Sequence, residues 1–108
     1  MHNSITVDEL FSGLGGVTLV DVRKPMARLE SGITMPEAQW RHPFDAASWV
    51  GDTPREGVVV FCVHGHEVSQ GVAGFLRDEG IQAVYLEGGF EAWREAGGAV
   101  QAKGSDNE

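Results

Sequence analysis

The sequence predicts an α/β domain in which a central, mostly parallel sheet is flanked by helices on both faces. Three apolar segments, 17–20, 58–61 and 83–86, alternate with segments of helical spacing, and the first two are rich in β-branched residues. Such alternation favours parallel strands joined by right-handed crossovers. Because 108 residues leave room for one core, we assign a single domain to residues 1–98 and expect a disordered, polar and acidic tail at 99–108.

Local signals delimit the elements of the N-terminal half. Thr6 and Glu9 have the spacing of a capping box, which predicts a short helix over 7–12 that the following glycines end. The apolar segment 17–20 predicts a strand buried on both faces, and this strand ends at the charged residues Asp21 and Arg23. Pro25 suits the first turn of a second helix, which stops by Gly32.

The middle of the chain, residues 33–55, has a weaker pattern. Prolines interrupt it, so we expect an irregular segment with one short helix near 45–50. Its three large aromatic residues, Trp40, Phe44 and Trp49, are expected to anchor the segment to the core.

The C-terminal half contains two further helices. Apolar residues at helical spacing between Ser69 and Gly80 predict a helix after the strand 58–61. Another amphipathic helix follows the strand 83–86 and ends before Gly97. The carboxyl ends of parallel strands are where α/β sheets bind ligands, and both Asp21 and Cys62 stand at such ends.

Composition narrows the classes of partner. Eight Lys and Arg against sixteen Asp and Glu give a formal charge of −8, which disfavours nucleic acid and anionic membrane surfaces as partners. No apolar run is long enough to cross a bilayer, and the N-terminus lacks the pattern of a secretion signal. The one cysteine cannot form an internal disulfide and suits a reducing compartment, so we expect a cytoplasmic protein.

The stretch that begins at Cys62 is the candidate site. A loop that leads from a central strand into a helix directs backbone N–H groups toward a common point, where an anion is favoured. The thiolate, which is the nucleophilic form of cysteine, is favoured at such a helix terminus. We therefore expect Cys62 to be a nucleophile. The anion cradle consists of the backbone amides that follow it, those of Val63, His64, Gly65, His66, Glu67 and Val68.

The side chains of this loop have both structural and chemical interpretations. Gly65 suits a left-handed turn, and Ser69 suits a helix cap. His64 and His66 are either solvated or placed to donate to an anion or to accept a proton. Two histidines beside a cysteine and a glutamate also resemble a metal-ligand set, but ligands packed this tightly in one loop cannot easily surround an ion. We expect neither a metal nor a cofactor.

These motifs together resemble the single-domain rhodanese sulfurtransferases. The residues that carry the resemblance are Asp21-Val22-Arg23, Glu30-Ser31-Gly32-Ile33, the strand that ends in Cys62, and Tyr85-Leu86-Glu87-Gly88-Gly89-Phe90-Glu91-Ala92-Trp93. The resemblance implies that Cys62 takes a sulfane sulfur from a small anion such as thiosulfate and passes it to a thiol acceptor, possibly a protein thiol, or to cyanide. It also implies that Asp21 and Arg23 support the site by ion pairing, with Glu30 a plausible partner for Arg23.

The loop departs from the family pattern in two ways. Many rhodaneses read Cys-x-x-Gly-x-Arg-Ser, whereas here Ser69 falls one place later and no arginine is present. Arg41 is a candidate for the replacement cation. The longer loop resembles that of Cdc25-type phosphatases and related arsenate reductases, which is an alternative function, although their Cys-x5-Arg pattern also needs an arginine. A non-catalytic rhodanese-like binding or sensing module is the other alternative.

Overall fold

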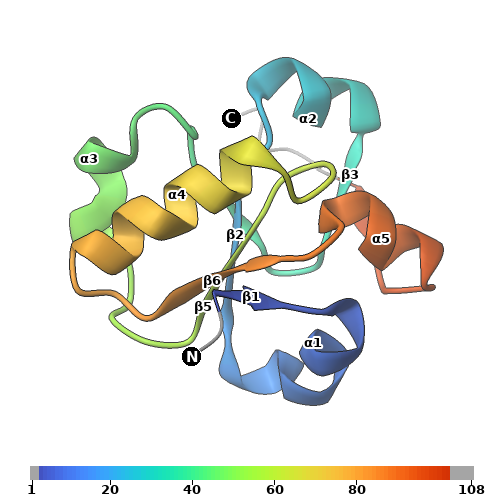
Figure 1. The fold of residues 1–108 in the computed structure, drawn as a ribbon. Helices are drawn as coiled ribbons and strands as arrows, with labels where there is room; N and C mark the ends of the chain where they lie inside the picture. The colour runs from blue at the N-terminus through green and yellow to red at the C-terminus, as the bar shows by residue number, and fades with distance from the viewer. Residues whose placement is uncertain (1–2, 103–108) are drawn as a thin grey trace.

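The computed structural model describes residues 3–102 and places seven strands and five α-helices in that range (Figure 1). The strands are β1 (Ser4–Ile5), β2 (Thr18–Asp21), β3 (Ile33–Thr34), β4 (Gln39–Trp40), β5 (Val58–Phe61), β6 (Ala83–Leu86) and β7 (Gln101–Ala102). The helices are α1 (Val7–Gly13), α2 (Pro25–Ser31), α3 (Ala46–Trp49), α4 (Glu67–Asp78) and α5 (Gly89–Glu95), with short 3-10 turns at Leu14–Gly16 and Val50–Asp52.

The main sheet has five parallel strands in the order β1-β6-β5-β2-β4. β5 lies at its centre, and Val60 is in register with Val20 of β2 and with Tyr85 of β6. All four residues of β5 are buried, as expected for a strand covered on both faces. The same register places Asp21 beside Phe61, so β2 and β5 end side by side, immediately before Cys62.

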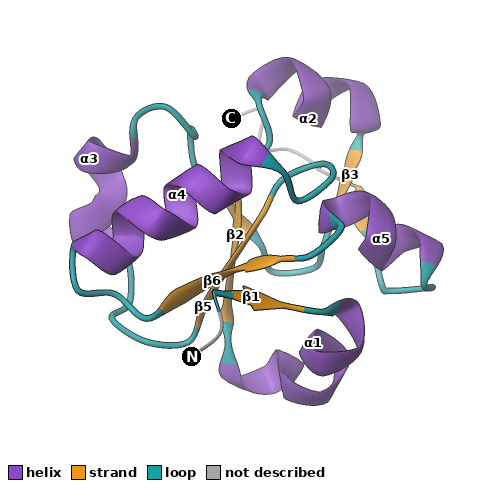
Figure 2. Ribbon diagram, in the orientation of Figure 1, coloured by secondary structure: helices purple, strands orange, loops and turns teal. Residues whose placement is uncertain are grey.

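The alternating side chains of β5 supply two separate cores, one on each face of the sheet. Val58 and Val60 pack with α3 and α4, whereas Val59 and Phe61 pack with α1 and α5. Figure 2 shows these helices on either side of the strands. The predicted α/β class, with helices on both faces of a parallel sheet, is therefore confirmed.

Four short strands were not expected from the sequence. β1 and β4 extend the main sheet at its two edges, and β3 pairs with β7 in a separate antiparallel sheet. Each has two residues, too few for any periodicity to mark it. Because β7 consists of Gln101 and Ala102, the expectation of disorder from residue 99 is wrong for these two residues. The remainder of the expected tail, 103–108, lies outside the described residues.

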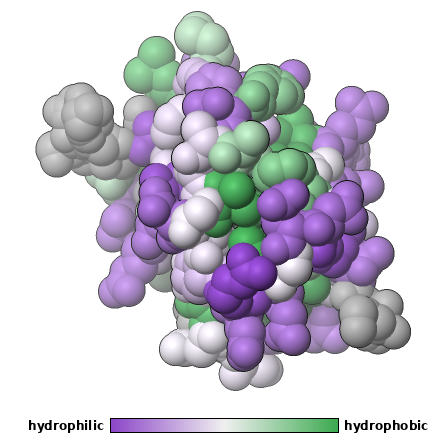
Figure 3. Space-filling model, turned by 90° about the vertical axis from the view of Figure 1, so that its left-hand side faces the viewer, coloured by the Kyte–Doolittle hydropathy of each residue, from purple (hydrophilic) through white to green (hydrophobic). Residues whose placement is uncertain are grey.

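The surface on the side of α3 and α4 is mostly hydrophilic, with hydrophobic residues showing in a strip between the polar ones (Figure 3). Of the aromatic residues expected to anchor the middle segment, Trp49 is buried and Trp40 is half-buried. Phe44 is 70% exposed, which corrects that expectation for this residue. Within residues 3–102, no helix has the length and apolar character needed to span a membrane.

Candidate active site

Cys62 lies at the carboxyl end of β5 and borders a surface hollow of about 230 Å³. The side chain is buried but reaches this hollow, with 6% of its surface exposed. The residues that line the hollow are Arg23, Lys24, Ala27, Cys62, Val63, His64, His66 and Val68. Most of the predicted site residues therefore meet in one place, whereas Asp21, Gly65 and Glu67 are not among the lining residues.

The loop after Cys62 is held by the beginning of α5. The backbone N–H of Phe90 donates to the Cys62 carbonyl at 2.8 Å, and that of Glu91 donates to the Val63 carbonyl at 3.0 Å. This approach requires glycine at position 89, where φ is +63° and an added Cβ would lie 2.6 Å from the Cys62 carbonyl oxygen. The Gly-Gly-Phe motif thus fixes the orientation of the nucleophile's loop.

The amides that follow Cys62 are not hydrogen-bonded to other described protein groups. In the part of the chain that the structure describes, no N–H group from Val63 to Ser69 donates a hydrogen bond to another protein group. α4 begins at Glu67 rather than after Val68, so the end of the expected loop is the helix's first turn. A helix's first amides have no acceptor within the helix, and its dipole favours negative charge there.

Ser69 contacts the sulfur directly. Its Oγ lies 3.1 Å from Cys62 Sγ, and both side chains are buried. This corrects the expectation that Ser69 caps the helix, because the N-cap residue is His66 and no side chain caps there. A neutral thiol donates a hydrogen bond to the hydroxyl, whereas an ionised sulfur accepts a hydrogen bond from it. Ser69 is therefore placed to stabilise a thiolate.

Replacement of Ser69 by Ala is expected to slow alkylation of Cys62 by iodoacetamide about tenfold at neutral pH. Hydrogen bonds to charged groups contribute about 1.5–3 kcal/mol, and the serine bond is one of several that can stabilise the thiolate. The measurement is the second-order alkylation rate, with the urea-unfolded variant as a reference for intrinsic thiol reactivity. An unchanged rate in a folded Ser69→Ala protein would show that the hydroxyl does not act on the sulfur.

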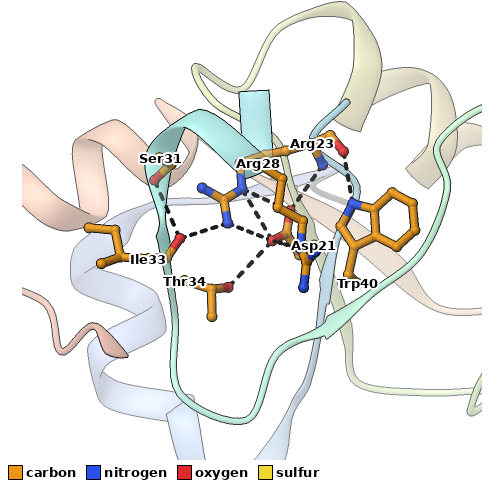
Figure 4. Close-up of polar contacts among 7 residues, drawn as sticks. All are labelled: Asp21, Arg23, Arg28, Ser31, Ile33, Thr34 and Trp40. Atoms are coloured by element: carbon orange, nitrogen blue, oxygen red, sulfur yellow. Dashed lines mark hydrogen bonds and ion pairs between the residues drawn. The ribbon is translucent and has the colours of Figure 1, made fainter. Parts of the chain in front are cut away.

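Asp21 and Arg23 form a buried ion pair at the end of β2. Each side chain is 1% exposed, and Arg23 Nη2 lies 2.8 Å from Asp21 Oδ2. Arg23 also donates through Nε and through its backbone N–H to the same carboxylate, and its Nη2 donates to the Ile33 carbonyl (Figure 4). The guanidinium lies 4.6 Å from the centroid of the Phe90 ring. The pair therefore ties β2 to the start of α5.

Three further side chains surround this pair. The hydroxyl of Thr34 donates to Asp21 Oδ2, and Arg28 Nε lies 3.9 Å from the same oxygen. Trp40 Nε1 donates to the Arg23 carbonyl at 2.9 Å. Arg23 is thus paired with Asp21, rather than with Glu30 as the sequence suggested. The pair is scaffold for the hollow, since the Arg23 charge is compensated by the Asp21 carboxylate inside the protein.

The two loop histidines are exposed at the rim of the hollow. Their ring centroids lie 6.1 Å apart. An adjoining hollow of about 280 Å³ has carboxylates, those of Glu30 and Glu91, among its lining residues. A hydrogen bond from Arg94 lowers the pKa of Glu91, and the charge of His64 acts in the same direction, although burial opposes them. Glu91 is therefore an anion near the rim at neutral pH.

The structure changes which cation lies beside Cys62. Lys24, which the sequence analysis did not single out, lines the Cys62 hollow, whereas Arg41 does not. Only the position of Lys24 in the fold could identify it: the residue comes directly before α2, at the edge of the sheet where β2 and β5 end side by side.

A larger hollow of about 630 Å³ lies at the amino ends of β5 and β6, away from every predicted site residue. Among residues 3–102, no group of three or more His, Cys, Asp and Glu is arranged to hold a metal ion.

Known proteins share this architecture. The sequence model of the rhodanese-like domain family matches residues 6–96. A rhodanese-related protein from Thermoplasma volcanium has a TM-score of 0.82 and 25% identity, with 93% of this chain and 98% of that chain covered. A rhodanese-like domain protein from Staphylococcus aureus has a TM-score of 0.77 and 29% identity, with 95% of this chain and 99% of that chain covered. A Rhodopseudomonas palustris protein of unknown function is described as a possible tyrosine phosphatase. It has a TM-score of 0.79 and 23% identity, with 93% of this chain and 85% of that chain covered.

Proposed function

The chain belongs to the rhodanese-like domain family, and on this premise we propose that it is a sulfurtransferase acting through a persulfide on Cys62. The proposed reaction moves a sulfane sulfur from a donor anion such as thiosulfate to a thiol or to cyanide. The observation that carries the proposal is the position of Cys62, which borders an open hollow and is hydrogen-bonded to Ser69 at the start of a run of unpaired amides. A reducing compartment such as the cytoplasm suits a lone nucleophilic thiol.

The proposed reaction has two displacement steps. The Cys62 thiolate attacks the outer sulfur of thiosulfate, the S–S bond breaks, and sulfite leaves with the bonding electron pair. The resulting persulfide is an anion, which the N–H groups from Val63 to Ser69 are free to stabilise. An acceptor thiolate then attacks the outer sulfur of the persulfide and releases the Cys62 thiolate. The acceptor thiol is carried by a small molecule or by a protein.

Replacement of Cys62 by Ser is expected to abolish sulfur transfer. A hydroxyl has the same connectivity as the thiol and is slightly smaller, but it is a far weaker nucleophile than a thiolate. The assay is thiocyanate formation from thiosulfate and cyanide, together with sulfide release when a dithiol is the acceptor. Activity that survives in Cys62→Ser would exclude the persulfide. Absence of transfer by the unaltered protein with every donor tried would favour a non-catalytic binding module.

Phosphatase chemistry is the second candidate, and one observation favours testing it. A solved structure with the same fold is described as a possible tyrosine phosphatase. The loop from Cys62 to Ser69 contains no arginine for bidentate recognition of a phosphate, so we rank this candidate lower. Hydrolysis of an aryl phosphate that is lost in Cys62→Ser would reverse that ranking.

A further inference from the structure

Two side chains of the hollow carry permanent positive charge, and their surroundings differ. Arg23 is buried and its guanidinium is bonded to the Asp21 carboxylate, so its charge is compensated inside the protein. Lys24 is exposed, and within the described residues no hydrogen bond or ion pair involves its ammonium group. The charge that remains available to a ligand in the hollow is therefore that of Lys24.

An aromatic ring lies beside this ammonium group. Lys24 Nζ is 6.0 Å from the centroid of the Phe44 ring, at the outer limit of a cation–π contact. Phe44 is 70% exposed, which is unusual for a phenylalanine, and its ring in turn packs edge-on against His42 at 6.0 Å.

The other charges near Cys62 do not attract an anion. Glu67 is exposed in the first turn of α4, and Glu91 lines the adjoining hollow as an anion. The chain as a whole has a formal charge of −8. An anionic donor is therefore repelled at long range, and a local cation beside the sulfur adds to the attraction of the loop's unpaired amides. The histidines at the rim supply positive charge only when protonated, whereas the lysine ammonium is charged at neutral pH.

We propose that Lys24 is the specificity-determining cation of this site and selects negatively charged donors for Cys62. The lysine reaches the hollow from the N-cap position of α2, on a different element from the loop that carries the cysteine. The substrate class is a small anion in which the charged group lies next to the electrophilic sulfur, such as a thiosulfate or a thiosulfonate. The identity of the donor as a sulfur compound rests on the proposed function. The selection of anions over neutral reagents by Lys24 does not.

Charge selection is measured with two alkylating reagents that differ in charge. The rate constants for Cys62 with iodoacetate and with neutral iodoacetamide are compared in the unaltered protein and in Lys24→Gln. Loss of one charge from the lining of the Cys62 hollow is expected to lower the iodoacetate to iodoacetamide rate ratio about threefold at low salt, and Lys24→Arg is expected to restore it. At about 1 M salt the difference is expected to disappear, because screening acts within a few Å.

Arg41→Gln is the matched control, because it removes the same charge from a residue that does not line the hollow. Its rate ratio is expected to remain that of the unaltered protein. An unchanged ratio in Lys24→Gln, or an equal fall in both variants, would overturn the proposal. Alkylation requires no sulfur transfer, so the inference can fail or hold independently of the proposed function. If transfer is measured, Lys24→Gln is expected to raise KM for thiosulfate with kcat retained.

Discussion

Replacement of Asp21 by Asn is expected to lower the free energy of unfolding by about 3–5 kcal/mol, because it leaves the Arg23 guanidinium buried without a counterion. Both side chains are 1% exposed, so water cannot take the place of the lost carboxylate. Asparagine keeps the shape of the side chain, which separates the loss of charge from the creation of a cavity. Urea unfolding followed by tryptophan fluorescence measures the change.

The double variant Asp21→Asn/Arg23→Met is the control for this interpretation. Removing both charges avoids an uncompensated buried cation, so part of the lost stability is expected to return. Arg94→Gln, which removes a surface ion pair with Glu91, is expected to cost less than about 1 kcal/mol. If Asp21→Asn costs no more than Arg94→Gln, the buried pair does not hold the site together.

Replacement of Gly65 by Ala is expected to cost at least about 2 kcal/mol of stability, because the residue would be both strained and in steric conflict. Gly65 has φ of +74°, and an added Cβ would lie 2.7 Å from both Gly88 N and the Leu86 carbonyl oxygen. These are backbone atoms, so no side-chain rotation relieves the contact. The loop is expected to move away from α5, and alkylation of Cys62 is expected to slow.

Gly71→Ala tests this explanation with the same substitution a few residues along the chain. Gly71 lies inside α4, and apart from the adjacent backbone of its own helix a Cβ there would meet no atom within 4 Å. This variant is therefore expected to gain about 0.5–1 kcal/mol of stability from the better helix propensity of alanine. If both glycine variants change stability in the same direction and by similar amounts, the close approach of Gly65 to the Gly88 turn is not what fixes the loop.

The elements with strong periodicity could be predicted from the sequence alone. β2, β5 and β6 are apolar segments with β-branched residues, and the capping box of Thr6 and Glu9 is present with reciprocal hydrogen bonds at 3.0 and 3.1 Å. The left-handed conformation of Gly65 was also predicted, because a turn between strand and helix favours glycine. These signals are local, and the tertiary packing of this fold agrees with them.

The remaining features depend on contacts between distant residues. Ser69 was expected to cap α4, and only the fold shows that its hydroxyl faces the sulfur seven residues earlier. Arg41 was the cation that the sequence suggested, but Lys24 is the residue that lines the hollow where β2 and β5 end together. The two-residue strands β3 and β7 are paired across most of the chain's length, and no local pattern marks such a pairing.

The most direct test of this account is the intact mass of the protein after incubation with thiosulfate and removal of excess reagent. The account predicts a gain of the mass of one sulfur atom, lost again on addition of a thiol and absent in Cys62→Ser. A protein that stays at its unmodified mass while iodoacetamide still labels Cys62 would contradict it, because an accessible thiol would then have failed to accept the sulfur.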